Sequence, residues 1–273
     1  MTDLAALRVP ALEQVNIRSV CVFCGSSSGR LPEYAEAAKL LGEYLAANSI
    51  QLVYGGGSAG IMGTVAKAVH NNGGKVLGII PRALLAYSGA KIGETIEVDD
   101  MHTRKQLMNE HSDAFITLPG GLGTLEEFFE TATWSQLNIH AKPILVLDTA
   151  GYYAPIRNWF MAAASSGFVS PGNANIAAFS STVPELMTSL ATYSVTHGRG
   201  ALGDLAWSGK AGELQKHNGV VPVARDQVSA DVRSVWPGEQ ADQVPPPPDS
   251  SASTDKLPAG LLASEGYTAA SQS

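Results

Sequence analysis

Short apolar runs rich in β-branched residues alternate along this chain with longer amphipathic stretches, from about residue 19 to about residue 190. Short runs of this kind are typical of buried strands, and the stretches between them place apolar side chains on one helical face. This alternation is the pattern of βαβ units, so it predicts an α/β fold with an open parallel sheet flanked by helices. The expected strands are residues 20–24, 51–54, 75–80, 95–98, 114–118, 143–147 and 176–179. The expected helices are residues 32–47, 59–72, 101–111, 123–137, 153–165 and 183–191.

The pattern divides the chain into one domain with extensions at both ends. Residues 1–17 form an N-terminal extension and residues 18–193 form the single α/β domain. Residues 194–220 are ambiguous, because a few apolar side chains around Trp207 could form a short helix that packs on the domain or on a partner. Residues 221–273 hold 3 basic and 7 acidic residues, four consecutive prolines and few adjacent apolar residues. Such a segment buries too little apolar surface to offset chain entropy, so we expect it to be disordered.

Composition and charge narrow the range of partners. The 273-residue chain is 45% hydrophobic, which is enough for a sizeable core, and its net charge is −7. Without a basic field we expect small-molecule or protein partners and no nucleic acid. No apolar run is long enough to span a membrane, and Asp3, Arg8 and Glu13 occupy the region where a signal peptide needs an apolar block. These observations favour a cytoplasmic protein that makes no membrane contact.

The two cysteines are spaced Cys21-x-x-Cys24, a spacing that also occurs in redox pairs and zinc sites. Here they lie in a predicted strand, where residues three apart point to opposite faces of the sheet. No second Cys or His pair with zinc spacing is present in the sequence. We therefore expect buried structural thiols and no metal site.

The motif PGGLGTLEE, at residues 119–127, follows an apolar run and opens a predicted helix. Glycines let backbone N–H groups approach a phosphate closely, and the start of a helix adds unpaired donors and a positive dipole end. Glu127 would repel a nearby phosphate, so its presence suggests work on another part of the ligand, such as a sugar. The spacing of Thr124 and Glu127 also fits a capping box, in which both side chains only satisfy N–H groups at the helix start. The residues alone leave these two interpretations open.

Two further glycine-rich loops follow predicted strands, where parallel sheets bind ligands. Residues 25–29, GSSSG, offer hydroxyl groups to a phosphate or a ribose, although a plain flexible loop has the same composition. Residues 55–63, GGGSAGIMG, match the dinucleotide pattern G-x-G-x-x-G. The acidic residue that NAD sites place at the end of the next strand is missing. Arg82 stands there instead and could serve a 2′-phosphate, so an NADP site stays an alternative.

The segment DDMHTRKQLM, at residues 99–108, follows the fourth predicted strand and opens a helix. Helical spacing places Arg104 and Met108 on one face. A planar guanidinium is well suited to holding a phosphate, a sugar or a base in a fixed orientation. The alternative is a solvated, charged helix start.

Over residues 18–190 the chain closely resembles the LONELY GUY (LOG) family of cytokinin-activating enzymes, phosphoribohydrolases that act on N6-substituted adenosine 5′-monophosphates. The family's paired functional residues, an Arg in DMHxRK and the last Glu of PGGxGTxxE, fall on Arg104 and Glu127. The resemblance implies a modified Rossmann-like domain, a homodimer and no cofactor. Many members carry the label lysine decarboxylase, which we set aside because such chemistry normally needs pyridoxal phosphate on a Schiff-base lysine. The motifs that carry the resemblance are FCGSS (23–27), VYGGGS (53–58), GIMG (60–63), GIIP (78–81), DMHTRK (100–105), PGGLGTLEE (119–127), TWSQLNIH (133–140) and KP (142–143).

This resemblance implies hydrolysis of the N-glycosidic bond of prenylated adenosine 5′-monophosphates, with release of free base and ribose 5-phosphate. Glu127 would stabilise the ribosyl cation and orient the attacking water, while Arg104 would fix the nucleotide and polarise the leaving base. The remaining residues expected to bind substrate are Ser26, Gly57, Met101, Lys105, Gly120, Gly121, Gly123 and Thr124. Two alternatives remain, namely a hydrolase of AMP and other nucleotides with broad specificity, and a nucleotide-binding module without catalysis.

Overall fold

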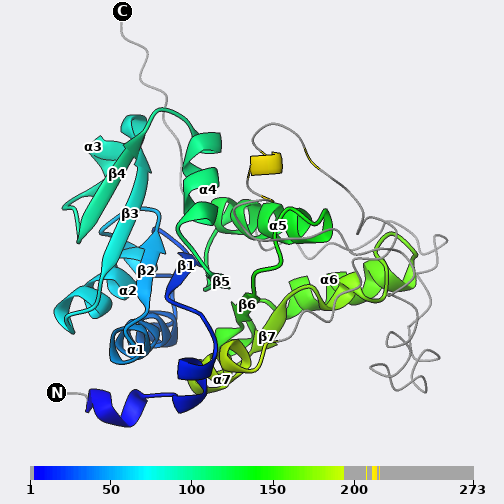
Figure 1. Cartoon of the computed structure of the whole chain (residues 1–273), viewed down its shortest axis with the longest axis horizontal. Helices are drawn as coiled ribbons and strands as arrows, with labels where there is room; N and C mark the ends of the chain where they lie inside the picture. The colour runs from blue at the N-terminus through cyan, green and yellow to red at the C-terminus, as the bar shows by residue number, and fades with distance from the viewer. Residues whose placement is uncertain (1–2, 194–206, 208–210, 214, 216–273) are drawn as a thin grey trace, which may run out of the picture. The chain divides into compact units, whose positions relative to one another are not determined.

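A computed structural model describes residues 3–193, 207, 211–213 and 215 of the chain. Its centre is a 7-stranded, all-parallel sheet with the strand order β4-β3-β2-β1-β5-β6-β7 (Figure 1). The fold predicted from the sequence is thus confirmed, and every expected strand lies within two residues of its predicted bounds. The strands are β1 (Ser19–Phe23), β2 (Gln51–Tyr54), β3 (Val76–Pro81), β4 (Glu94–Val98), β5 (Ala114–Thr117), β6 (Ile144–Leu147) and β7 (Ala178–Ser180).

Helices cover both faces of the sheet (Figure 1). On one face, α1, α2 and α7 bury Leu41, Val65 and Leu186 against the sheet. On the other face, α4, α5 and α6 bury residues such as Met108 and Phe128. The six longer helices in the described part of the chain match the expected ones within one residue. They are α1 (Pro32–Ala47), α2 (Gly60–Asn71), α4 (Met101–Glu110), α5 (Leu122–Gln136), α6 (Ala154–Ser165) and α7 (Val183–Ala191).

Within residues 3–193, six short helical elements do not follow from the apolar pattern, because a single turn has too few residues to show a period. They are the 3-10 helices η1 (Leu4–Leu7), η2 (Pro10–Gln14), η3 (Arg82–Leu84), η4 (Thr149–Gly151) and η5 (Asn173–Asn175), and the helix α3 (Leu85–Ser88).

The two cysteines lie on opposite faces of the sheet, as their spacing predicts. Cys21 packs in the cluster beneath α4, α5 and α6, and Cys24 packs in the cluster beneath α1, α2 and α7. Both are free and buried, and burial raises the pKa of both thiols. The expectation that both thiols are buried is therefore confirmed.

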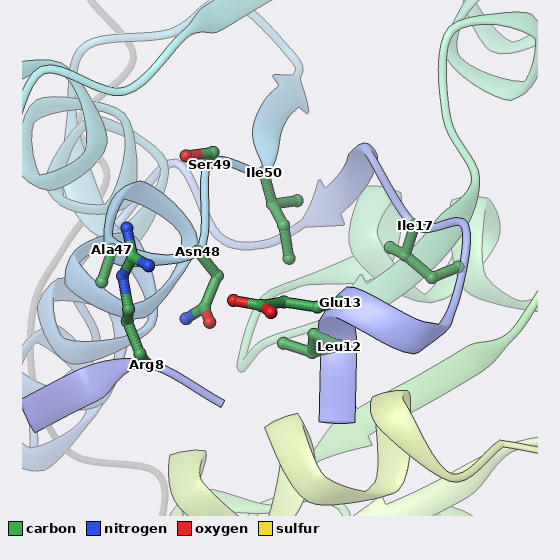
Figure 2. Close-up of a pocket in the computed structure, with 8 residues that line it drawn as sticks. All are labelled: Arg8, Leu12, Glu13, Ile17, Ala47, Asn48, Ser49 and Ile50. Atoms are coloured by element: carbon green, nitrogen blue, oxygen red, sulfur yellow. The ribbon is translucent and has the colours of Figure 1, made fainter. Parts of the chain in front are cut away.

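The N-terminal extension is joined to the domain through Asn48, the residue that ends α1. Its side-chain amide donates to the Leu7 carbonyl at 3.0 Å and accepts from the Val9 N–H at 2.8 Å. A cavity of about 240 Å³ lies beside this joint, between η2 and the turn from α1 to β2. Figure 2 shows Arg8, Glu13 and Asn48 around it. Its lining includes Ile17 and Ile50, which precede β1 and β2, so it lies at the amino-terminal edge of the sheet.

Beyond residue 193, two hydrogen bonds with the domain are described. The Trp207 indole N–H donates to the Leu137 carbonyl at 2.9 Å, and the Gln215 amide donates to the Asn138 carbonyl at 2.9 Å. Trp207 and Gln215 therefore contact the turn that follows α5. The expected disordered tail, residues 221–273, lies outside the described residues, and the division of the chain into four parts stays a prediction. None of the helices described is long and apolar enough to cross a membrane.

Candidate active site

The glycine-rich loops after β1, β2 and β5 meet at the carboxyl edge of the sheet. The Gly25 N–H donates to the Pro119 carbonyl at 3.1 Å, which joins the β1 loop to the β5 loop. The Met62 N–H donates to the Gly25 carbonyl at 3.0 Å, which joins the β2 loop to the same place. The strand order reverses between β1 and β5, and such a switch point is where open α/β sheets bind ligands.

A cavity of about 290 Å³ opens at this switch point. The β1 loop, including Ser26, forms one wall, and the β5 loop, including Gly120 and Gly121, forms another. Tyr34 and Tyr152 complete its lining. The structure therefore brings three residues that we expected to bind substrate, Ser26, Gly120 and Gly121, to one cavity.

The start of α5 decides between the two interpretations of the PGGLGTLEE motif. The helix begins at Leu122 with Gly121 as its N-cap residue, and no side chain caps it. Thr124 and Glu127 are therefore inside the helix, and the capping-box interpretation is wrong. Thr124 is buried, and its hydroxyl lies so close to Gly120 that a Cβ there would be 2.2 Å from Oγ1. Only glycine fits at position 120 against this hydroxyl.

Arg104 and Glu127 form a buried ion pair between α4 and α5. The Arg104 Nη1 donates to the Glu127 Oε1 at 2.7 Å, and the Arg104 Nε donates to the Ile79 carbonyl at 3.0 Å. The two residues are only 7% and 8% exposed. A Cβ on Gly55 would lie 2.3 Å from the Arg104 Nη2, so glycine in the β2 loop makes room for the guanidinium. The pair is fixed by contacts from β3, the β2 loop and α5.

The helix α4 presents Arg104 because its first turn is capped. The Asp100 side chain accepts hydrogen bonds from the Thr103 N–H and the Thr103 hydroxyl, both at 2.8 Å. An N-terminal carboxylate of this kind satisfies a helix donor and interacts favourably with the helix dipole. The sequence left open that this segment is only a solvated, charged helix start. Asp100 and Met101 are exposed as that alternative expects, but Arg104 is buried, which contradicts it.

Burial controls the protonation of Glu127. Desolvation raises the pKa of its carboxyl above the ordinary value of 4.5, and the nearby Arg104 opposes this shift only in part. A carboxylate with a raised pKa is a stronger base than a solvated one, so it is better suited to accept a proton from water. The pair therefore combines a fixed cation with a carboxyl whose pKa is raised by burial.

The other predicted substrate-binding residues take different positions. Burial works to lower the pKa of Lys105, but hydrogen bonds with Glu126 and Glu130 hold this pKa above its ordinary value. The Lys105 ammonium thus contacts α5 beside the Arg104–Glu127 pair. The Gly57 N–H points to the sulfur of Met62 at 3.3 Å. Met101 and Gly123 are exposed at the starts of α4 and α5.

Arg82 is the candidate for binding an NADP 2′-phosphate. It forms surface ion pairs with Glu97 on the edge strand β4 and with Asp99, which follows that strand. Two acidic partners oppose the binding of a further anion, which weakens the NADP alternative.

The chemistry of a lysine decarboxylase needs a lysine that forms an imine with pyridoxal phosphate. Burial lowers the pKa of Lys142 to about 8, and a lowered pKa is one requirement of such a lysine. Lys142 precedes β6 and so lies at the amino edge of the sheet, opposite the glycine loops.

Sequence reasoning missed three groups that shape this site. They are the space that Gly55 leaves for Arg104, the Ile79 carbonyl, and two tyrosines after β6, Tyr152 and Tyr153, whose hydroxyls bond to the β5 loop. A signal for the tyrosines exists, because they follow a predicted strand and so belong to the carboxyl edge. The Ile79 contact has no sequence signal, since a backbone carbonyl is present at every position.

The fold and the site together define a Rossmann-like α/β protein with a glycine-lined cavity at the switch point of its sheet. The family model described as "Possible lysine decarboxylase" matches residues 62–190. The chain is 48% identical over 191 residues to a probable cytokinin riboside 5′-monophosphate phosphoribohydrolase, LOGL2, of Oryza sativa subsp. japonica, covering 69% of this chain and 78% of that protein. It is 46% identical over 199 residues to the cytokinin riboside 5′-monophosphate phosphoribohydrolase LOG3 of Arabidopsis thaliana, covering 72% of this chain and 92% of that protein. The chain therefore belongs to the LOG family of cytokinin riboside 5′-monophosphate phosphoribohydrolases.

Solved structures agree on the fold. The Moco carrier protein of Chlamydomonas reinhardtii superposes with a TM-score of 0.50 at 18% identity, covering 64% of this chain and 96% of that protein. The structure titled TM1055 superposes with a TM-score of 0.51 at 20% identity, covering 65% of this chain and all of that one. At such identity the likeness concerns the fold alone.

Proposed function

We propose that this protein hydrolyses the N-glycosidic bond of cytokinin riboside 5′-monophosphates and releases the free base and ribose 5-phosphate. The observation that carries the proposal is the buried Arg104–Glu127 pair, whose guanidinium lies against Gly55 of the β2 loop, on a sheet that has a glycine-lined cavity at its switch point. Membership of the LOG family supports the same activity, since the curated relatives bear this name.

The reaction replaces the bond between C1′ and the base nitrogen with a bond between C1′ and a water oxygen. The base departs with the electron pair of the broken bond, and the transition state resembles an oxocarbenium ion. Glu127 supplies negative charge next to C1′ and, with its raised pKa, accepts a proton from the attacking water. The leaving base takes up a proton from solvent. Arg104 holds the nucleotide and polarises the base without giving up its own proton.

The phosphate of the substrate is assigned to the β5 loop and the start of α5. Gly120, Gly121 and Gly123 offer backbone N–H groups, and the uncapped helix start contributes its positive dipole end. Thr124 is buried one turn into the helix and supports the loop through its contact with Gly120. Ser26 faces the same cavity from the β1 loop and supplies a hydroxyl for a phosphate or ribose oxygen.

The decisive experiment measures release of free base and ribose 5-phosphate from isopentenyladenosine monophosphate, AMP, GMP and CMP by the purified protein. We expect preference for the prenylated nucleotide. Comparable cleavage of AMP would instead indicate a nucleotide hydrolase of broad specificity. If no nucleotide loses its base although AMP binds, the chain is a nucleotide-binding module and the proposed activity is wrong.

The raised pKa of Glu127 predicts the acid side of the pH profile. Catalysis needs the ionised carboxylate, so kcat/KM should fall as pH decreases through the raised pKa, and the fall should begin above the ordinary value of 4.5. The measurement is kcat/KM for the best substrate between pH 4 and pH 8, in buffers of constant ionic strength. Full activity down to pH 4.5 would contradict the assignment of Glu127 as the base.

We further propose a homodimer in the cytoplasm. Exposed apolar side chains support association, since Leu122 on α5 and Phe168 after α6 are 88% exposed and Trp159 on α6 is 48% exposed in the single chain. Sedimentation equilibrium would test the dimer, and a monomer at assay concentrations would contradict it.

The proposed cytoplasmic location is a separate prediction. Cell fractionation would test it, and recovery of the chain outside the cytoplasmic fraction would contradict it.

A further inference from the structure

Two consecutive tyrosines after β6 bond to the glycine loop after β5. The Tyr152 hydroxyl donates to the Gly120 carbonyl at 2.6 Å, and the Tyr153 hydroxyl donates to the Leu118 carbonyl at 2.8 Å. A tight turn brings them there, because Ala150 has a positive φ of 54° and the Tyr153 N–H donates to the Asp148 carboxylate at 2.6 Å. Neither tyrosine belongs to the motifs that identify the family.

With these bonds, three consecutive carbonyls of the loop point at protein donors. The Leu118 and Gly120 carbonyls accept from the tyrosines, and the Pro119 carbonyl between them accepts from the Gly25 N–H at 3.1 Å. A trans peptide unit directs its N–H opposite to its carbonyl. The Gly121 N–H therefore faces away from the Tyr152 hydroxyl and has no hydrogen-bond partner within the described part of the chain, whereas the Gly120 N–H bonds to the Tyr153 hydroxyl.

This arrangement suits an anion. A phosphate is repelled by carbonyl oxygens and attracted by N–H groups, so a loop that binds it must keep its carbonyls turned away. Proline at position 119 has no N–H and cannot contribute a donor of its own. The free donor of the loop is thus the Gly121 N–H, and the hydrogen bond at the Gly120 carbonyl holds it in one orientation.

The two tyrosines differ in exposure. Tyr153 is 2% exposed and belongs to the core, whereas Tyr152 is 42% exposed and lines the cavity. Its ring packs edge-on against Tyr34 at 5.7 Å and against Tyr153 at 4.9 Å between ring centroids. These contacts fix the Tyr152 ring, so its hydroxyl is held at the Gly120 carbonyl.

We propose that Tyr152 is a positioning residue for phosphate binding: its hydroxyl holds the peptide between Gly120 and Gly121 so that the Gly121 N–H faces the phosphate of the ligand. This inference rests on the proposed function, which assigns a nucleotide phosphate to the loop. Tyr153 anchors the same loop from the core. Without the Tyr152 hydroxyl, the Gly120 carbonyl is free to rotate toward the anion and repel it.

The test is Tyr152→Phe, which keeps the ring and its packing and removes only the hydroxyl. The matched control is Tyr44→Phe on α1, which removes a hydroxyl that no hydrogen bond in the described residues uses. We expect Tyr152→Phe to raise KM for the nucleotide about tenfold while kcat stays within about twofold, because one neutral hydrogen bond and its geometry are lost. Tyr44→Phe should match the unsubstituted protein in both constants. A fall in kcat with unchanged KM would overturn the proposal.

Calorimetric titration with ribose 5-phosphate separates this inference from the proposed function, because binding needs no turnover. The unsubstituted protein should bind ribose 5-phosphate, and Tyr152→Phe should bind it about tenfold more weakly. Equal affinities, or no binding to the unsubstituted protein, would overturn the role of Tyr152. A third outcome is that no nucleotide loses its base, although the unsubstituted protein binds ribose 5-phosphate and Tyr152→Phe binds it about tenfold more weakly. This outcome would overturn the proposed hydrolysis and support the role of Tyr152.

Discussion

Glu127→Gln should lower kcat for base release by about 10²–10³-fold or more, the effect typical of losing one aligned charged group in an active site. The glutamine keeps an oxygen that accepts from the Arg104 Nη1, so the contact between α4 and α5 survives. What it removes is the negative charge next to C1′ and the base that accepts a proton from water. The measurement is single-turnover base release at saturating nucleotide, which reports the chemical step without product release.

Folding should not explain this loss. The folded state raises the pKa of Glu127, so the ionised carboxylate costs more in the folded chain than in the unfolded chain. The stability linked to this group is fully present below its unfolded pKa and is lost as pH rises through its folded pKa. At pH 7 the uncharged glutamine avoids this cost, and we expect an unfolding temperature equal to or above that of the unsubstituted protein.

Glu126→Gln is the matched control for Glu127→Gln. It makes the same chemical change one residue earlier, at an exposed carboxylate that pairs with Lys105, and Glu130 remains to hold that lysine. We expect its kcat within about twofold of the unsubstituted protein, as for most exposed ion pairs. If Glu127→Gln turned over as fast as Glu126→Gln, Glu127 would have no part in the chemistry.

Arg104→Lys should lower kcat/KM about 10²-fold, although it keeps the positive charge. Arg104 uses two nitrogens at once, with Nε bonded to the Ile79 carbonyl and Nη1 bonded to Glu127. A lysine has a single ammonium on a flexible stem, so it cannot make both contacts in the same geometry. Since Arg104 works to lower the pKa of Glu127, a weaker contact should also move the acid side of the pH profile to higher pH.

Arg82→Lys gives the comparison for Arg104→Lys. Arg82 is exposed and pairs with Glu97 and Asp99, and a lysine can replace it in such a surface network. Its kcat/KM should stay within about twofold of the unsubstituted protein. Equal activity of Arg104→Lys and Arg82→Lys would show that only the charge at position 104 matters, and the argument from the guanidinium geometry would fail.

The site was predictable to the extent that its parts are local. The three glycine loops and the DMHTRK segment each follow a strand that the apolar pattern already indicates, so their shared edge could be predicted from a parallel sheet. The assignment of Arg104 and Glu127 as partners came from the family resemblance. Their side chains lie on two different helices, 23 positions apart in the sequence, and no periodicity relates them.

The capping-box interpretation of Thr124 and Glu127 shows where local signals mislead. The spacing of these two residues is correct for a capping box. The helix nevertheless begins at Leu122, two residues before Thr124, with Gly121 as its N-cap residue. Which residue starts a helix depends on where the β5 loop is held, and this depends on donors from the β1 loop and from Tyr152 and Tyr153. Those donors are distant in sequence.

By itself, the sequence determined the α/β class, the seven strands and six longer helices, the buried cysteines and the glycine loops, because each depends on side-chain periodicity or backbone freedom within a few neighbouring residues. The tertiary structure alone decided that Arg104 and Glu127 form a buried pair and that Gly55 makes room for it. It also decided which carbonyls of the β5 loop are held away from the cavity. These features depend on desolvation and on contacts between segments that only the packed sheet brings together.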